Sequence, residues 1–434
     1  MSRTSAKRDR TPAQQAGRAY LAASALGALN TANARRPLKE VPQLGALGFF
    51  PGWLTSELPL HAIGWQALAT AAYARKGALR SWRGMVGLGL SAASWAALAK
   101  MYQQGMASGA LFDEALREGL GDELDAGRTP MAPDEEVPLT RRQLLAGPAS
   151  VTRTRRRYVA KGPALSYGDA GRRNQLDVWK RTDLPDDANA PVLLQVHGGG
   201  WVIGNKDQQA TPLMAHMCER GWVCVSINYR LSPRATWPDH IVDVKRAIAW
   251  VKANIAEHGG DPDFVAITGG SAGGHLSSLA ALSANEPAFQ PGFEEADTSV
   301  VAAVPFYGVY DFTNRDGTGL ADMEKMLADV VFKTRLAEDR ETWEQASTMS
   351  WVRPDAPPFM IVHGENDTLV PVAQARSFAA MLRAESKSPV VYVELPGTQH
   401  AFEIFDSPRS HHAVHAAGRF LAAIRAREDQ HTDL

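Results

Sequence analysis

A chain of 434 residues is longer than one minimal domain needs, and it can hold one large domain together with an extension. The formal net charge of -1 provides no long-range field that would favour nucleic acid. The only cysteines, Cys218 and Cys224, are too few for a disulfide framework or a zinc site. A single bond between them stays open, but we favour two small buried residues beside one strand.

The N-terminal forty residues are rich in arginine and lysine, and we expect 1–40 to be a flexible basic arm. An Ala-rich apolar run is followed by Ala32-Asn33-Ala34, which has the form of a signal-peptidase site. The preceding basic stretch is long and the apolar run is poor in Leu and Val, so we favour an uncleaved arm.

Residues 41–157 predict a helical region that ends in a linker. No acidic residue occurs between Glu57 and Asp113, where two apolar stretches of about 16 or 17 residues flank a short basic link. That length is the lower limit for crossing a bilayer. A lid helix exposed to water would carry a charged outer face, which these stretches lack. We therefore predict membrane association through 58–99; the alternative is a pair of Ala-rich helices packed as a lid.

Residues 158–434 alternate short apolar runs with helical patterns. In 239–257, for example, apolar residues recur at the 3.6-residue spacing of a helix. Apolar strands that alternate with helices predict an α/β fold, with a mostly parallel central sheet covered by helices on both faces. The expected strands are 192–196, 223–227, 264–268, 300–306, 359–362 and 390–395.

The strongest chemical signal is Gly269-Gly270-Ser271-Ala272-Gly273, which directly follows a predicted strand and precedes a helical pattern. A G-x-S-x-G sequence in this context is typical of a nucleophile elbow. The turn is so tight that side chains at the flanking positions would collide, and the serine takes up strained backbone geometry. We therefore predict Ser271 as a nucleophile.

A second signal, His197-Gly198-Gly199-Gly200, follows the strand 192–196. Consecutive glycines let backbone N–H groups approach a developing oxyanion without obstruction. We predict that the donors are Gly198, Gly199 and the N–H of Ala272, and that His197 shapes the loop. A phosphate-binding loop is excluded because no Lys-Ser/Thr pair follows the glycines.

The orienting acid and the base are expected after the last two strands. Asp367 follows the strand 359–362, with Glu365 as a nearby rival and Asp311 as a distant one. His400 follows the strand 390–395 and is the one histidine of the twelve with this placement. The chain order Ser, Asp, His is typical of α/β-hydrolases.

Other histidines have weaker claims to a chemical role. His275 lies one turn into the elbow helix, where a packing role is expected, and His363 precedes the predicted acid. A late helical pattern carries His411, His412 and His415, for which metal binding is a weak alternative.

These motifs resemble the hormone-sensitive-lipase-like branch of the α/β-hydrolase family, which carries an HGGG loop. The run Asn228-Tyr229-Arg230-Leu231-Ser232-Pro233 and the sequence Gly-Asp-Pro at 260–262 are similar to that branch. The resemblance extends from about residue 158 onward and implies a carboxylic ester hydrolase with a lid. Similar apolar N-terminal zones occur in actinobacterial members, which adds support by analogy to a membrane-associated location.

Together the motifs predict a serine carboxylesterase or lipase that acts on a small-molecule or lipid ester and needs neither cofactor nor metal. Trp201 follows the glycines, as it also does in formamidase-like relatives, so an arylformamidase-like amidase with the same triad is the first alternative. A catalytically dead hydrolase fold used as a binding module is the second. The pattern indicates no nucleic-acid partner and leaves the oligomeric state open.

Overall fold

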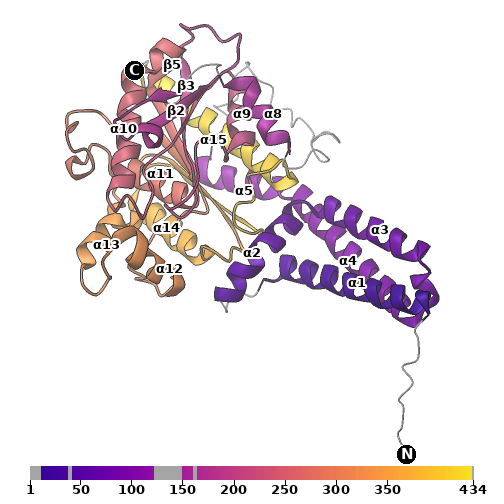
Figure 1. The fold of residues 1–434 in the computed structure, drawn as a ribbon. Helices are drawn as coiled ribbons and strands as arrows, with labels where there is room; N and C mark the ends of the chain where they lie inside the picture. The colour runs from indigo at the N-terminus through magenta and orange to yellow at the C-terminus, as the bar shows by residue number, and fades with distance from the viewer. Residues whose placement is uncertain (1–10, 38–41, 122–148, 160–163, 320, 433–434) are drawn as a thin grey trace, which may run out of the picture. The chain divides into compact units, whose positions relative to one another are not determined.

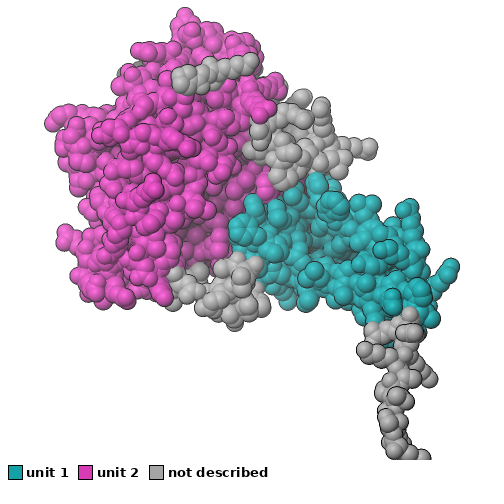
Figure 2. Space-filling view, in the orientation of Figure 1, with its two compact units in different colours: residues 1–106 teal, residues 107–434 magenta. Residues whose placement is uncertain are grey.

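The protein divides into two compact units, residues 1–106 and residues 107–434 (Figure 2). The first is a group of helices and the second is built on a β-sheet. The structure is a computed structural model, and it describes residues 11–37, 42–121, 149–159, 164–319 and 321–432.

The N-terminal unit is made of long helices that run beside one another (Figure 1). Three of these helices begin with proline. Proline is suited to this position because the first N–H of a helix makes no hydrogen bond within the helix, and because the fixed φ of proline is a helical one. Residues 12–35, expected within a flexible arm, instead form a helix with a capping box between Thr11 and Gln14. The described helices of this unit are α1 (Pro12–Arg35), α2 (Pro42–Glu57), α3 (Pro59–Arg75) and α4 (Trp82–Met106).

Small and hydroxyl-bearing residues fill the interior of this unit. The Tyr20 hydroxyl lies 2.9 Å from Thr70 Oγ1 and donates to Ser91 Oγ at 3.1 Å. At Gly84, a Cβ atom would lie 2.0 Å from the carbonyl oxygen of Ala78, so α4 and the preceding turn approach as closely as glycine permits. Packing in this unit therefore depends on close backbone approach and on paired hydroxyls more than on large apolar side chains.

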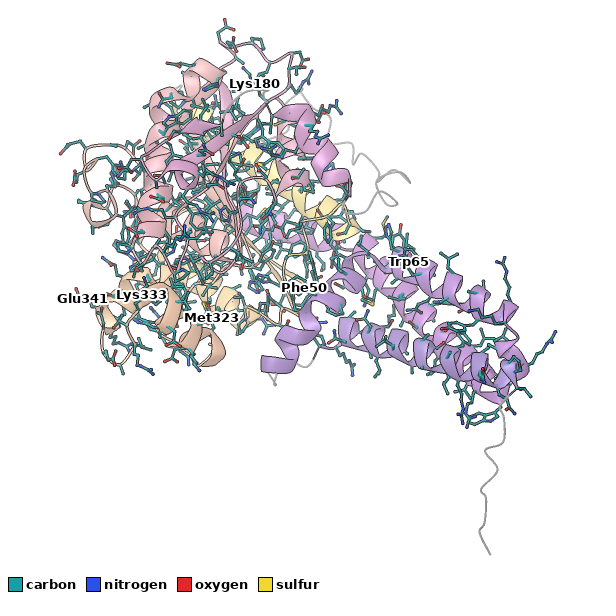
Figure 3. The ribbon with its side chains drawn as sticks, in the orientation of Figure 1. Phe50, Trp65, Lys180, Met323, Lys333 and Glu341 are labelled. Carbon is teal, nitrogen blue, oxygen red and sulfur yellow. The ribbon has the colours of Figure 1, made fainter. Side chains whose placement is uncertain are left out.

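Several large apolar side chains of the same unit lie on its outside. The exposed fraction is 74% for Trp65 and 64% for Phe50, which Figure 3 labels. These exposed apolar side chains agree with the missing charged outer face in the sequence. The predicted membrane-associated location through 58–99 is nevertheless wrong, since none of the described helices combines the length and the apolar composition that a bilayer crossing requires. α3 has only 17 residues, and glycine and serine lower the hydropathy of α4.

The second unit is built on a sheet of eight described strands in the order β1-β2-β4-β3-β5-β6-β7-β8. From β4 to β8 neighbouring strands are parallel, and β1 and β2 add an antiparallel edge that the sequence analysis missed. The strands are β1 (Leu165–Ser166), β2 (Gln175–Trp179), β3 (Ala190–Val196), β4 (Val223–Ile227), β5 (Gly260–Gly270), β6 (Ala302–Phe306), β7 (Phe359–Gly364) and β8 (Val390–Leu395).

Helices cover this sheet, and the predicted α/β-hydrolase fold is confirmed. α10 and α11 pack on each other and on β5, whereas α15 packs on α5 and α9 and contacts β6 and β7 (Figure 1). Cys218 and Cys224 are buried and free. The helices are α5 (Gly109–Leu120), α8 (Ala149–Tyr158), α9 (Thr211–Glu219), α10 (Asp239–Asn254), α11 (Ala272–Leu282), α12 (Ala321–Met326), α13 (Arg340–Ala346), α14 (Val372–Glu385) and α15 (Pro408–Thr432).

The carboxyl ends of the parallel strands lie at one edge of the sheet, which is where ligands bind in open α/β sheets. The glycine-rich loop follows β3 at this edge, and Ser271 directly follows β5. Asp367 comes three residues after β7 ends, and His400 comes five residues after β8 ends. The topology therefore brings the predicted site residues to the same edge.

Candidate active site

Ser271 occupies the turn between β5 and α11 in a strained conformation, with φ 59° and ψ -122°. The turn needs glycine on both sides. At Gly269 a Cβ atom would lie 2.4 Å from the carbonyl oxygen of Gly273, and at Gly273 it would lie 2.1 Å from that of Val196. Ser271 stays partly accessible at the N-terminus of α11, whose dipole favours negative charge.

The glycine-rich loop after β3 lies against this serine. A Cβ atom at Gly198 would be 3.1 Å from Ser271 Cβ. Gly198 N–H, predicted as an oxyanion donor, instead donates to Gln209 Oε1 at 2.6 Å. Among the described residues no hydrogen bond engages the N–H groups of Gly199 and Gly200. The loop therefore offers its second and third glycines, rather than its first, as donors.

Buried neutral histidines hold the two ends of this loop. His197 stacks on Tyr229 and its Nδ1 donates to the carbonyl of Gly198 at 2.7 Å, as expected of a loop-shaping residue. Trp201 Nε1 donates to His275 Nδ1 at 3.2 Å, while His275 Nε2 donates to the carbonyl of Ala346. Burial lowers the pKa of His275 to about 3 and that of His197 to about 4, so both rings remain uncharged at neutral pH.

Asp367 is completely buried beside two imidazoles. Its Oδ2 lies 2.6 Å from His400 Nδ1 and 3.2 Å from His363 Nε2. Its Oδ1 accepts the N–H groups of Leu369 and Val370, each at 2.8 Å. Burial disfavours the carboxylate, but the two histidines outweigh it and hold the pKa of Asp367 well below its usual range.

The two rival acids have other partners. Glu365 Oε2 accepts the N–H of Gly397 in the turn after β8. Asp311 accepts from Thr313 and Arg315, which it ties into the loop after β6. Asp367 is the rival that the structure places at the His400 ring.

His400 lies in the loop after β8 and is buried, with 4% of its surface exposed. Because Nδ1 faces a carboxylate, the proton of the neutral ring resides there and Nε2 keeps a lone pair. Its ring centroid is 4.4 Å from that of Tyr307. Tyr307 follows Phe306, whose carbonyl accepts the N–H of Ser271 at 3.0 Å. The backbone of the serine and the ring of the imidazole therefore both lie next to the Phe306-Tyr307 segment.

Sequence reasoning missed four residues around this site. Gln399 Oε1 accepts the N–H groups of both His400 and Thr368, at 2.9 and 2.8 Å, so it joins the base loop to the acid loop. His363 supports Asp367, Tyr307 packs on His400, and Gln209 holds Gly198. For His363 a signal was available, since it is the last residue but one of β7 and lies four residues before the acid. The contacts of Gln399 with Thr368 and of Tyr307 with His400 join segments that are distant in sequence, whereas Gln209 and Gly198 lie in the one loop between β3 and α9.

The comparisons with known proteins identify the family and the fold of the chain. The family model described as BD-FAE matches residues 176–382. The protein named "Probable carboxylic ester hydrolase LipM" of Mycobacterium tuberculosis is 47% identical over 412 residues, which cover 94% of this chain and 93% of LipM. The chain belongs to the same family of α/β-hydrolase esterases as LipM. Esterase LipQ of the same organism is 44% identical and covers 88% of the chain, with 86% of LipQ aligned.

Among solved structures, the butyrate-bound esterase Est2 of Thermogutta terrifontis superposes with a TM-score of 0.52 at 25% identity. The match covers 60% of this chain and 92% of Est2. A truncated carbohydrate esterase from gut microbiota matches with a TM-score of 0.53 at 23% identity, covering 62% of this chain and 97% of that one, which supports the fold alone. The predicted enzyme class is confirmed: this member of the family is a hydrolase of carboxylic ester bonds.

Proposed function

We propose that this enzyme is a serine carboxylesterase that forms an acyl-enzyme on Ser271, with His400 as the base and Asp367 as the acid that orients it. The observation that carries the proposal is the 2.6 Å hydrogen bond between His400 Nδ1 and Asp367 Oδ2. The buried carboxylate holds the imidazole in the tautomer that a general base needs and stabilises its positive form.

In the proposed reaction, Ser271 Oγ attacks the ester carbonyl carbon while His400 Nε2 takes the hydroxyl proton. The tetrahedral intermediate collapses, the bond from the carbonyl carbon to the alcohol oxygen breaks, and His400 gives that oxygen its proton. A water molecule then attacks the acyl-enzyme with His400 again as base. Loss of the carboxylic acid restores the Ser271 hydroxyl.

We propose that the N–H groups of Gly199, Gly200 and Ala272 bind the oxyanion. Gly200 thus replaces Gly198, which the sequence predicted as a donor. Donation from Gly198 to Gln209 argues against the earlier assignment, because one N–H cannot serve both acceptors well. Ala272 begins α11, where the first N–H groups of a helix have no partner within it. Each oxyanion donor is worth about 3 kcal/mol of barrier.

We propose short acyl esters as the first substrates to assay, on the strength of the butyrate bound to the related Est2. A series of p-nitrophenyl esters of increasing acyl length measures the preference and separates an esterase from a lipase. An aryl formamide assayed in parallel tests the arylformamidase-like alternative, which gains support if it is turned over faster than every ester.

The decisive experiment replaces the nucleophile and a matched serine on the same helix. Ser271→Ala should lose nearly all turnover of p-nitrophenyl butyrate and all labelling by a fluorophosphonate, with unchanged melting. Ser278 is fully buried on α11 and its hydroxyl donates to the carbonyl of Gly274, so Ser278→Ala should keep both the turnover and the labelling. A Ser271→Ala enzyme with near-native turnover contradicts the proposal, and a native protein that is never labelled favours the binding-module alternative.

A further inference from the structure

Tyr307 has an unusual position beside the base. It directly follows β6 and has a positive φ of 39°, a conformation that is costly for an aromatic residue and persists when its surroundings impose it. Its N–H donates to the carbonyl of Val362 at 2.7 Å. The ring also occupies the space beside Gly270, where a Cβ atom would lie 2.7 Å from the Tyr307 oxygen. The chain thus holds this ring between the nucleophile turn and His400.

The phenol of Tyr307 connects the base to a second buried carboxylate. Its hydroxyl donates to Glu403 Oε2, and only 1% of Tyr307 and 3% of Glu403 is exposed. Burial raises the pKa of Tyr307 well above its usual value, and the Glu403 carboxylate raises it further. The phenol therefore remains protonated and donates throughout the neutral and mildly alkaline range.

We propose that Tyr307 and Glu403 act as positioning residues that stabilise the positive form of the His400 imidazole during ester hydrolysis. This inference rests on the proposed function, in which His400 becomes positively charged when it takes the proton of Ser271. The tilted Tyr307 ring, 4.4 Å away, then offers a π-system to a cation. Donation of the phenol to a carboxylate makes that ring richer in electrons, so the charge of Glu403 acts on the imidazole through the tyrosine.

Other groups facing His400 give the proposal its scale. From the β7 side the carboxylate of Asp367 contacts Nδ1 directly, and His363 lies behind that carboxylate. Tyr307 approaches from β6, and Glu403 belongs to the loop of His400 itself. Asp367 remains the stronger partner of His400. Glu403 adds a smaller stabilisation, which water does not screen because Tyr307 and Glu403 are both buried.

The test is the pH profile of kcat/KM for p-nitrophenyl butyrate in the full-length enzyme. Glu403→Gln keeps an acceptor for the phenol but removes the charge. It should lower kcat about threefold to tenfold and move the acidic limb of the profile to lower pH by about half a unit or more. Tyr307→Phe, which keeps the ring and loses the link to Glu403, should move the limb in the same direction. A role in folding alone would not displace the limb.

The chain supplies a matched control. Tyr392 on β8 also donates its hydroxyl to a glutamate, Glu394, at 2.8 Å, and neither residue takes part in the proposed site. Tyr392→Phe should leave the profile unchanged. An unmoved acidic limb in folded, fluorophosphonate-reactive Tyr307→Phe or Glu403→Gln enzyme overturns this inference but leaves the triad intact. Activity of Ser271→Ala at the native rate would instead overturn the proposed function.

Discussion

The amide of Gln399 provides the sharpest test of how the site is held together. Its Oε1 accepts the N–H of Thr368, the neighbour of Asp367, and the N–H of His400, at 2.8 and 2.9 Å. Gln399→Met keeps the length of the side chain but leaves two buried N–H groups without this acceptor. Each unsatisfied group costs about 1 to 3 kcal/mol, so the free energy of unfolding should fall by about 2 to 6 kcal/mol.

Activity should fall as well, because the two loops that carry the acid and the base lose their common acceptor. A displacement of about 1 Å at a reacting group can cost about a hundredfold in rate, so we expect kcat to drop about tenfold to a hundredfold. Urea unfolding measures the first effect. Initial rates on p-nitrophenyl butyrate, corrected for the folded fraction, measure the second.

Gln374 on α14 is the matched control because it makes the same kind of contact elsewhere. Its Oε1 accepts the N–H groups of Tyr310 and Asp311 at 3.0 and 3.3 Å, and its Nε2 donates to the carbonyl of Asp311. Gln374→Met should cost at least as much stability and leave kcat within about twofold of the native value. If the two variants lose stability and kcat in equal measure, Gln399 has no particular role in aligning the triad.

Two further predictions concern packing and pH. Gly84→Ala should destabilise the N-terminal unit by about 1 to 3 kcal/mol, because the new Cβ would lie 2.0 Å from a carbonyl oxygen. A Cβ atom at Gly89 on the same helix would meet nothing within 4 Å, so Gly89→Ala should leave the stability unchanged or raise it. Limited proteolysis compares the two variants, and equal resistance would refute the predicted clash at Gly84. Burial lowers the pKa of His275 to about 3 and that of His197 to about 4, whereas the pKa of a histidine in the unfolded chain is about 6.5. Between the folded and the unfolded pKa the unfolded chain binds more protons than the folded one. The free energy of unfolding therefore falls as the pH falls through this range. The free energy of unfolding, measured with urea, should be lower at pH 5 than at pH 7 by about 1.4 kcal/mol per pH unit for each histidine well inside that window. Equal free energies at the two pH values would contradict the buried neutral state.

The amino-acid sequence by itself determined the fold class and the enzyme class, and it predicted the candidate triad. Ser271 could be predicted as the nucleophile because a nucleophile elbow is built from consecutive residues, and the glycines on either side prove to be sterically required. Asp367 and His400 could be predicted as the acid and the base because parallel strands place their following loops at one edge of the sheet. Such inferences need only local pattern and the rule that parallel strands point the same way.

Only the tertiary structure decided which loop atoms meet. Gly198 loses its expected role to a bond with Gln209, and Tyr307 meets Glu403 across 96 positions of sequence. The N-terminal unit shows the same limit. The missing charged face of 58–99 predicts a membrane location, whereas no helix in the described part of the chain is both long and apolar enough to cross a bilayer. The physical reason is that contacts between distant segments depend on how backbones pack in three dimensions, and periodicity along one element carries no information about its neighbours.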